Sequence, residues 1–131
     1  MENKKKILVA DDDRAVTEVM KSGLEGQGYD VVVTHDGNEA LELAKLYKPD
    51  LAILDVLMPG MDGVRVASYL KLDTETRDIP IMILTGFVEK ENEQQMQQEL
   101  RGALFMTKPF NLKDFLRMVA QALAEKEEKK S

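Results

Sequence analysis

Short runs of apolar residues recur at five places along the chain. The runs are near-continuous rather than alternating, and they are rich in Ile, Val and Leu. This pattern is typical of strands that are buried on both faces, as in a parallel sheet covered by helices. The predicted strands are Ile7–Ala10, Val31–Val33, Leu51–Leu54, Ile81–Leu84 and Leu104–Met106.

Between and after these runs, apolar residues recur at intervals of three and four, which predicts amphipathic helices. The segment Glu89–Leu100 is weaker, because it is rich in Glu and Gln and has only Met96 and Leu100 as its main apolar anchors. We expect it to form a helix that is loosely packed on one side. The other stripes run over residues 16–24, 40–47, 66–70 and 112–123, and Asn111 with Asp114 would cap the last.

Strand and helix patterns therefore alternate five times, with turn signals such as Asp36-Gly37, Pro59-Gly60 and Asp62-Gly63 between them. Parallel strands need crossover helices, and these crossovers are right-handed. The expected fold is α/β: a doubly wound (βα)5 three-layer sandwich around a five-stranded parallel sheet. Residues 125–131 are charged and are expected to form a fraying, solvated helix end.

Composition narrows the class of protein. A chain of 131 residues, 44% hydrophobic and 32% charged, suits one globular domain over 1–131. The net charge of −6 argues against nucleic acid as a partner, and no apolar stretch approaches membrane-spanning length. Cysteine is absent, which excludes disulfides and thiolate sites and fits a cytoplasmic protein.

Polar side chains gather where the predicted strands end. In a parallel sheet these ends share one edge, where ligands bind. Carboxylates, a hydroxyl and an ammonium together fit phosphoryl transfer to a carboxylate, which needs a divalent cation such as Mg²⁺ and fixed donors. We expect Asp11, Asp12 and Asp55 to lie within a few ångströms of one another. Because carboxylates that close repel, we expect a cation between them. The residues are Asp11, Asp12, Asp13, Asp55, Thr85 and Lys108.

Simpler roles exist for several of these residues. Asp11 and Asp12 could cap the helix that starts near Arg14, although capping needs only one acid, and Asp13 fits that role best. Asp55 could form a structural ion pair with a lysine. The single histidine, His35, has no second histidine or cysteine for company, so we expect it to be exposed and to hold no metal.

Five segments match, in order, the motifs of one known family. They are "ILVADDD" (7–13), "THDGNEAL" (34–41), "PDLAILDVLMPGMDG" (49–63), "IPIMILTGF" (79–87) and "GALFMTKPF" (102–110). On these segments the chain resembles the response-regulator receiver domain of two-component signalling, over about residues 5–124. The resemblance implies a flavodoxin-like sheet with strand order 2-1-3-4-5.

The resemblance also assigns roles at the strand ends. Asp55 corresponds to the phosphoacceptor. Asp12 corresponds to a direct Mg²⁺ ligand and Asp11 to an acid that holds the metal through water, while the backbone carbonyl of Leu57 would complete the metal site. Thr85 corresponds to the switch hydroxyl that moves onto the phosphoryl group.

Expectations for further positions follow from the same resemblance. Lys108 corresponds to the cation that pairs with the phosphoryl group, and its bond to Pro109 would be cis. Phe105 corresponds to the switch aromatic, in a place where tyrosine is common, and the turn before it looks one residue shorter than in many relatives. Leu57 and Phe87 are apolar where many relatives are polar, so we expect slow self-dephosphorylation.

The sequence therefore predicts a phosphoryl-accepting switch that is not an enzyme beyond its own phosphoryl transfer and dephosphorylation. Its partners would be a sensor histidine kinase or a histidine phosphotransfer protein, and an output protein that reads the face around Phe105, the Gln-rich helix and the last helix. Two alternatives remain. One is a receiver-like scaffold that is never phosphorylated, and the other is an Mg²⁺-dependent phosphohydrolase, which would need a second acid at the position of Leu57.

Overall fold

The computed structural model describes residues 4–86 and 89–130, in which five parallel strands form one sheet. The apolar runs become its strands, each extended by one or two residues at most. The order β2-β1-β3-β4-β5 confirms the expected doubly wound, flavodoxin-like topology. The strands are β1 (Lys6–Ala10), β2 (Asp30–Thr34), β3 (Leu51–Asp55), β4 (Ile81–Thr85) and β5 (Leu104–Thr107).

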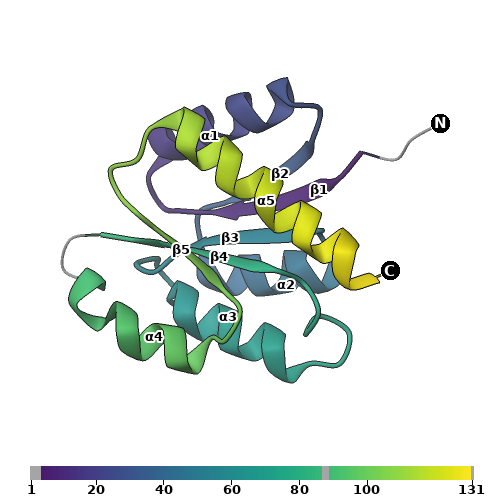
Figure 1. The fold of residues 1–131 in the computed structure, drawn as a ribbon. Coiled ribbons are helices and arrows are strands. Elements are labelled where there is room, and N and C mark those ends of the chain that lie inside the picture. Colours follow the sequence, from purple (N-terminus) through teal and green to yellow (C-terminus); the bar gives the residue numbers. More distant parts are fainter. Residues whose placement is uncertain (1–3, 87–88, 131) are drawn as a thin grey trace.

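Helices cover both faces of the sheet, which completes the three layers (Figure 1). On one face lie α1 (Arg14–Gly26) and α5 (Leu112–Lys130). On the other lie α2 (Gly37–Tyr47), α3 (Gly63–Leu72) and α4 (Glu93–Glu99). No helix within the described part of the chain is both long and apolar enough to cross a membrane.

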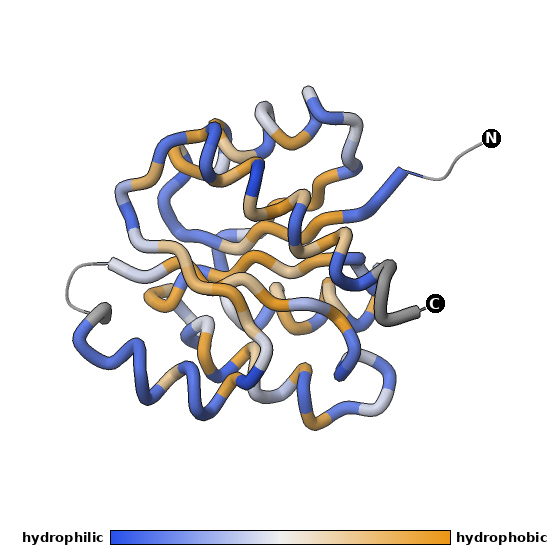
Figure 2. Tube along the Cα trace, in the orientation of Figure 1, coloured by the Kyte–Doolittle hydropathy of each residue, from blue (hydrophilic) through white to orange (hydrophobic). Residues whose placement is uncertain are grey.

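The two faces of the sheet bury separate apolar clusters. Along β1, Ile7 and Val9 pack in the cluster beneath α1 and α5, whereas Leu8 and Ala10 pack in the cluster beneath α2, α3 and α4. This alternation is the two-residue period of a strand that is buried on both sides. Each fully buried Leu, Ile or Val contributes about 1.5–3 kcal/mol. Apolar residues accordingly follow the central strands, and polar residues follow the outer side of α4 (Figure 2).

Both predicted helix caps are present. The Asp13 carboxylate accepts from the N–H groups of Ala15 and Val16, at 3.0 and 3.2 Å, and so caps α1. The Asn111 side chain accepts from the N–H of Asp114 at 2.7 Å, and its amide donates to the Asp114 carboxylate at 3.0 Å. Asp13 therefore caps the start of α1 and does not belong to the acid cluster, because an N-cap acid satisfies N–H groups that have no partner within the helix.

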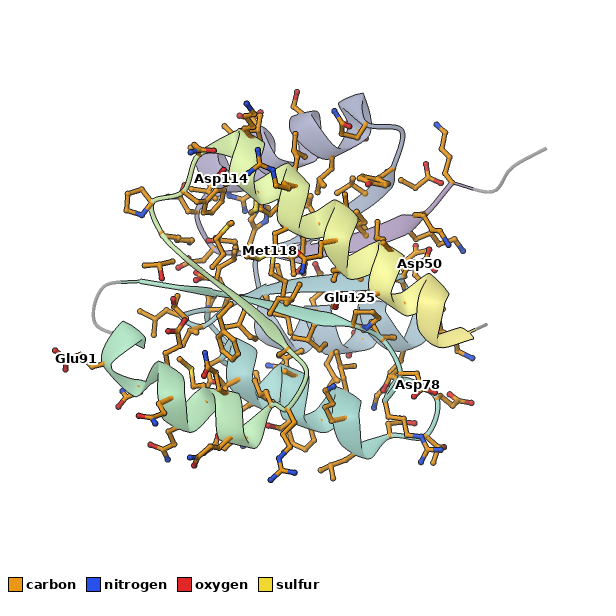
Figure 3. All side chains as sticks on the ribbon, viewed as in Figure 1. Asp50, Asp78, Glu91, Asp114, Met118 and Glu125 are labelled. Carbon is orange, nitrogen blue, oxygen red and sulfur yellow. The ribbon has the colours of Figure 1, made fainter. Side chains whose placement is uncertain are left out.

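The Gln-rich segment departs from the expected single helix. A 3-10 turn, Glu89–Asn92, precedes α4, and only Met96 of α4 is buried. Leu100, directly after α4, is also buried, while Glu91 points outward (Figure 3). Two apolar anchors are too few to bury a longer amphipathic face, so the expectation of loose packing on one side holds.

One contact was not expected from the sequence, and one expectation is corrected. At the start of the charged tail, the Lys126 ammonium of α5 lies 3.4 Å from the Asp50 carboxylate, with both side chains mostly buried. His35 is half-buried rather than exposed, because its Nε2 lies 3.2 Å from the buried Thr17 hydroxyl of α1. Both contacts join segments far apart in sequence.

Candidate functional site

The parallel register brings four strand ends to one edge of the sheet. Ala10, the last residue of β1, pairs with Leu54, so Asp11 and Asp55 follow at the same level. Asp55 in turn pairs with Leu84 in β4, and Thr85 pairs with Thr107 in β5. The residues that the sequence places after four different strands therefore meet in space.

Three carboxylates form a cluster at this edge. Asp11, Asp12 and Asp55 each offer an oxygen, and these atoms lie within 4.8 Å of one another. Asp11 and Asp55 are buried, at 0% and 6% exposure, whereas Asp12 faces solvent. The expected grouping within a few ångströms is thus confirmed. The Asp13 N–H supports it by donating to Asp11 Oδ1 at 2.9 Å.

Lys108 is the cation that faces this cluster. Its Nζ lies 2.5 Å from Asp11 Oδ2 and 3.3 Å from Asp55 Oδ2, so two buried acids share one ammonium. The Lys108 N–H donates to the carbonyl of Thr85 at 2.7 Å, which ties the loop after β5 to the end of β4. The bond from Lys108 to Pro109 is cis, as the resemblance implied.

Because Asp55 is buried and shares its cation with Asp11, the pKa of the Asp55 carboxyl is shifted from its usual value. Burial and the neighbouring Asp11 charge raise its pKa, and Lys108 offsets them only partly, so the pKa stands at about 7. Burial lowers the pKa of Lys108, but Asp11 and Asp55 outweigh this and raise it overall. The ammonium therefore stays charged at neutral pH, while the Asp55 carboxyl divides between its protonated and ionised forms.

The donor set of the cluster fits Mg²⁺. Mg²⁺ takes oxygen ligands, commonly one or two carboxylates together with waters and phosphate oxygens. Asp11 Oδ2 is buried and accepts no hydrogen bond from the described residues apart from its ion pair with Lys108. An excess of buried negative charge beside an accessible Asp12 is what a divalent cation neutralises. The Leu57 side chain is 62% exposed, and its carbonyl as a metal ligand stays a prediction.

The two predicted switch residues, Thr85 and Phe105, lie on one face of neighbouring strands. Thr85 is fully buried, and its hydroxyl lies 3.5 Å from that of Thr107. Phe105 is half-buried against the cluster beneath α2, α3 and α4, and it pairs with Ile83 in β4. Thr85 and Thr107 are paired, so their side chains point to the same side of the sheet. Phe105 points to that side too, because side chains two residues apart on a strand share a face.

Sequence reasoning missed Thr107 as the partner of Thr85. A hydroxyl-bearing residue just before the lysine of "TKP" was a visible signal, but its contact depends on the register of β4 against β5. Phe87, which was expected to shield the site, lies outside the described residues.

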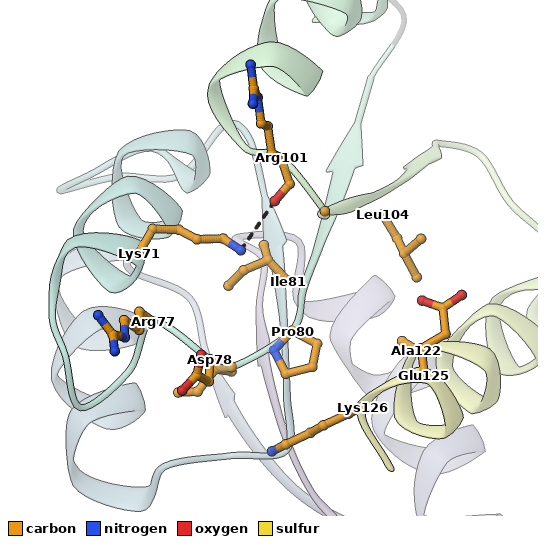
Figure 4. A pocket seen from close by; sticks show the side chains of 12 residues that line it. Lys71, Arg77, Asp78, Pro80, Ile81, Arg101, Leu104, Ala122, Glu125 and Lys126 are labelled. Atoms are coloured by element: carbon orange, nitrogen blue, oxygen red, sulfur yellow. Dashed lines mark hydrogen bonds between the residues drawn. The ribbon is translucent and has the colours of Figure 1, made fainter. Parts of the chain in front are cut away.

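Two cavities of similar size lie at opposite edges of the sheet. One, of about 480 Å³, is lined by Val16 and Val19 of α1 and by Lys108, the residue that pairs with Asp11 and Asp55. The other, of about 490 Å³, lies where β4 and β5 begin (Figure 4). There the Lys71 ammonium donates to the carbonyl of Arg101 at 3.4 Å, and none of the predicted site residues takes part. The chemistry therefore points to the first cavity.

Known proteins share the sequence and the fold. Residues 7–120 match the family model of the response regulator receiver domain. The chain is 40% identical over 107 residues to the alkaline phosphatase synthesis transcriptional regulatory protein PhoP of Bacillus subtilis, covering 82% of this chain but only 43% of PhoP. It is 30% identical over 121 residues to the polar-differentiation response regulator DivK of Brucella anthropi, covering 92% of this chain and 98% of DivK.

Solved structures agree. A CheY-like response regulator receiver domain protein from Methanospirillum hungatei superposes with a TM-score of 0.86 at 29% identity, covering 97% of this chain and 99% of that one. The receiver domain of a histidine kinase from Syntrophus aciditrophicus does so with a TM-score of 0.83 at 32% identity, covering 92% and 91%. The chain therefore belongs to the response regulator receiver domain family, the phosphorylatable switches of two-component systems.

Proposed function

We propose that Asp55 accepts a phosphoryl group from a phosphohistidine of a sensor histidine kinase or a histidine phosphotransfer protein, in an Mg²⁺-dependent reaction in the cytoplasm. One observation carries the proposal. Asp55 is a buried carboxylate that shares a single ammonium with Asp11 and lies in one acid cluster with Asp11 and Asp12. A structural ion pair needs one acid and one base, so the surplus acids call for another cation.

The chain's own groups divide the work of the transfer. An ionised oxygen of Asp55 attacks phosphorus, the P–N bond to the donor imidazole breaks, and the imidazole leaves with the electron pair and takes up a proton. The products are an aspartyl phosphate and a neutral histidine. Because the Asp55 pKa is about 7, part of the carboxyl must lose its proton before it can attack. The Lys108 ammonium then faces the phosphoryl oxygens and balances their charge.

Asp11, Asp12, Asp55 and the Leu57 carbonyl would hold the Mg²⁺ ion. When bound, the ion neutralises the negative charge that spreads over the phosphoryl oxygens. The exposure of Asp12 leaves the cluster open on one side, which supports entry of a hydrated ion. The cavity beside Lys108 supports the approach of a protein donor, because Val19 there is an apolar side chain that is 54% exposed.

Thr85 and Phe105 would carry the signal away from the site. Thr85 ends β4 directly after Leu84, the residue that pairs with Asp55, and we expect its hydroxyl to leave Thr107 for a phosphoryl oxygen. Phe105 lies on the same face, half-buried, and can turn inward when that space is vacated. The face around Phe105, α4 and α5 would then bind the output partner.

Incubation with acetyl phosphate and Mg²⁺, followed by mass spectrometry, tests the proposal. One phosphoryl group should add to the parent and none to Asp55→Asn. Asp50→Asn is the matched control, because it places the same substitution just before the other end of β3, and it should be labelled normally. Labelling of Asp55→Asn at the parent level would overturn the assignment. Absence of labelling in the parent would favour the scaffold, and continuous turnover of the donor would favour the phosphohydrolase.

A further inference from the structure

The "THDGNEAL" segment has no part in the phosphoryl chemistry, yet it contacts the loop that follows Asp55. This loop, residues 56–62, joins β3 to α3 and contains Leu57. The segment enters α2, whose first residue is Gly37. The Gly37 N–H donates to the carbonyl of Pro59, in the middle of the loop, at 3.0 Å. The start of α2 is thus bonded directly to the loop that follows the phosphoacceptor.

The approach at Gly37 is too close for any side chain. A Cβ on Gly37 would lie 1.7 Å from the carbonyl oxygen of Met61, whereas real Cβ atoms essentially never come within 3.0 Å of another heavy atom. Next to it Gly60, at φ +81°, sits with its backbone against the Asp36 carboxylate, so a Cβ there would lie 2.8 Å from Asp36 Oδ2. Two independent close approaches therefore seat the loop on the start of α2.

The same segment reaches the other half of the acid cluster. The Thr34 carbonyl accepts from the N–H of Asp11 at 3.2 Å, and the Thr34 hydroxyl donates to Glu39 of α2 at 2.5 Å. On the far side of the loop, the Gly63 N–H donates to the carbonyl of Val56 at 2.9 Å. The segment therefore contacts both chain segments that carry the cluster: Thr34, at the end of β2, contacts the one after β1, and Gly37, at the start of α2, contacts the one after β3.

We propose that Gly37 is a positioning residue: the start of α2 clamps loop 56–62, through the Pro59 carbonyl and the Met61 backbone, in the conformation in which the acid cluster binds Mg²⁺ and Asp55 accepts a phosphoryl group. The inference rests on the proposed function, because it concerns the same site. It adds one requirement outside the site residues themselves, which is a glycine at position 37. A Cβ at position 37 would lie 1.7 Å from the Met61 carbonyl oxygen, so a larger residue must push that oxygen to beyond 3.0 Å from the Cβ. The loop must shift with it.

Gly37→Ala tests the clamp, with Gly26→Ala as its matched control. Gly26 is the last residue of α1, and a Cβ there would meet nothing within 4 Å. The Mg²⁺ concentration that half-saturates labelling by acetyl phosphate should rise roughly 10- to 100-fold in Gly37→Ala, the usual cost of losing support for metal ligands. It should stay at the parent value in Gly26→Ala. Equal Mg²⁺ dependence in the two variants would overturn the clamp while leaving the proposed function intact, since labelling of the parent tests that separately.

Hydrogen exchange of the unmodified chain tests the clamp even if Gly37→Ala does not fold. If clamp and metal stabilise one conformation, Mg²⁺ must slow hydrogen exchange at the Gly37 N–H, because coupling between sites is reciprocal. The Gly28 N–H is the control amide: it also donates at 3.0 Å, to Glu25 at the end of α1. Mg²⁺ alone should slow exchange at Gly37 more than at Gly28. No change, or equal change at both amides, would overturn the proposal.

Discussion

An aspartate and a lysine pair at each end of β3, and the two pairs differ in nearly every respect. Asp50, just before the strand, lies 3.4 Å from the Lys126 ammonium and accepts from the Lys6 N–H at 2.8 Å. Burial raises the pKa of Asp50, but these two partners, together with the charge of Lys5, outweigh it and hold the pKa below its usual value. Asp55, at the end of the strand, must share Lys108 with Asp11, and its pKa rises to about 7.

The difference shows how the same two residue types can serve structure or function. At Asp50 one acid pairs with the Lys126 ammonium, close to the charge of Lys5, so the carboxylate is satisfied and the pair holds α5 to the sheet. At Asp55 two buried acids meet one cation, so the folded chain carries uncompensated negative charge. This excess of negative charge costs stability and at the same time favours the binding of a cation.

Replacing each lysine by alanine should give the largest difference between the two pairs, in the free energy of unfolding. Lys108→Ala leaves Asp11 and Asp55 buried without a cation, so at pH 8 we expect a loss of about 3–5 kcal/mol in the free energy of unfolding. Lys126→Ala removes a partner from a carboxylate that still accepts from Lys6, and should cost about 1 kcal/mol or less. Urea unfolding of both variants measures this, and equal losses would mean that the two pairs are alike.

The pH dependence of stability gives a second contrast. The raised pKa of Asp55 stabilises the fold fully below the usual value of 3.8, and this stabilisation is lost as pH rises through about 7. The loss should approach about 4 kcal/mol, at roughly 1.4 kcal/mol per pKa unit. The lowered pKa of Asp50 acts with the opposite sign, and its stabilisation disappears only as pH falls below about 4.

Urea unfolding from pH 4 to 8 without Mg²⁺ should therefore show falling stability in the parent and in Asp50→Asn. The decline should be much flatter in Asp55→Asn, because that variant has no carboxyl to titrate. A decline of equal steepness in all three proteins would assign the pH dependence to other groups.

Under the proposed function Mg²⁺ should stabilise the parent, because the ion would bind the folded cluster and not the unfolded chain. At a hundredfold excess over its dissociation constant the gain is about 2.7 kcal/mol. Asp12→Asn removes one ligand and one repelling charge, so this variant should melt slightly above the parent without metal and gain little from Mg²⁺. Thermal melts of both proteins test this. A variant that is less stable than the parent without metal would make Asp12 a structural acid.

The phosphoryl lifetime should show the smallest effect. Leu57 lies in the loop after Asp55, and its apolar side chain offers nothing to orient an attacking water. Leu57→Asn should therefore release the phosphoryl group a few times faster than the parent, in a decay followed by mass spectrometry after removal of the donor. Because the side chain is 62% exposed, it can also point away from the site, and an unchanged decay would show that it does.

Strands and site residues were predictable for different reasons. The apolar runs of β1 and β3 specify buried strands, and parallel topology then forces Asp11 and Asp55 to one edge, so local pattern and one rule of chain connection were enough. The contact of Thr107 with Thr85 needs the register of β4 against β5, which no local pattern carries.

Contacts between distant segments were beyond sequence reasoning. Lys126 meets Asp50 across 76 positions, and the half-burial of His35 depends on how α1 packs on the sheet. The turn signal at Asp36-Gly37 was visible, but the backbone that Gly37 touches comes from a different loop. Side-chain chemistry can be read locally, whereas close approaches of backbone require the packed fold.

The most direct test is an NMR titration of the side-chain carboxyl carbons of Asp50 and Asp55 in one sample, without and with Mg²⁺. We predict that Asp55 titrates near pH 7 without metal while Asp50 titrates below its usual range, and that saturating Mg²⁺ lowers the Asp55 midpoint and leaves that of Asp50 unchanged. An Asp55 midpoint at or below about 4 without metal would contradict the idea that one ammonium serves two buried acids. A midpoint unmoved by Mg²⁺ would remove the cluster as the metal site.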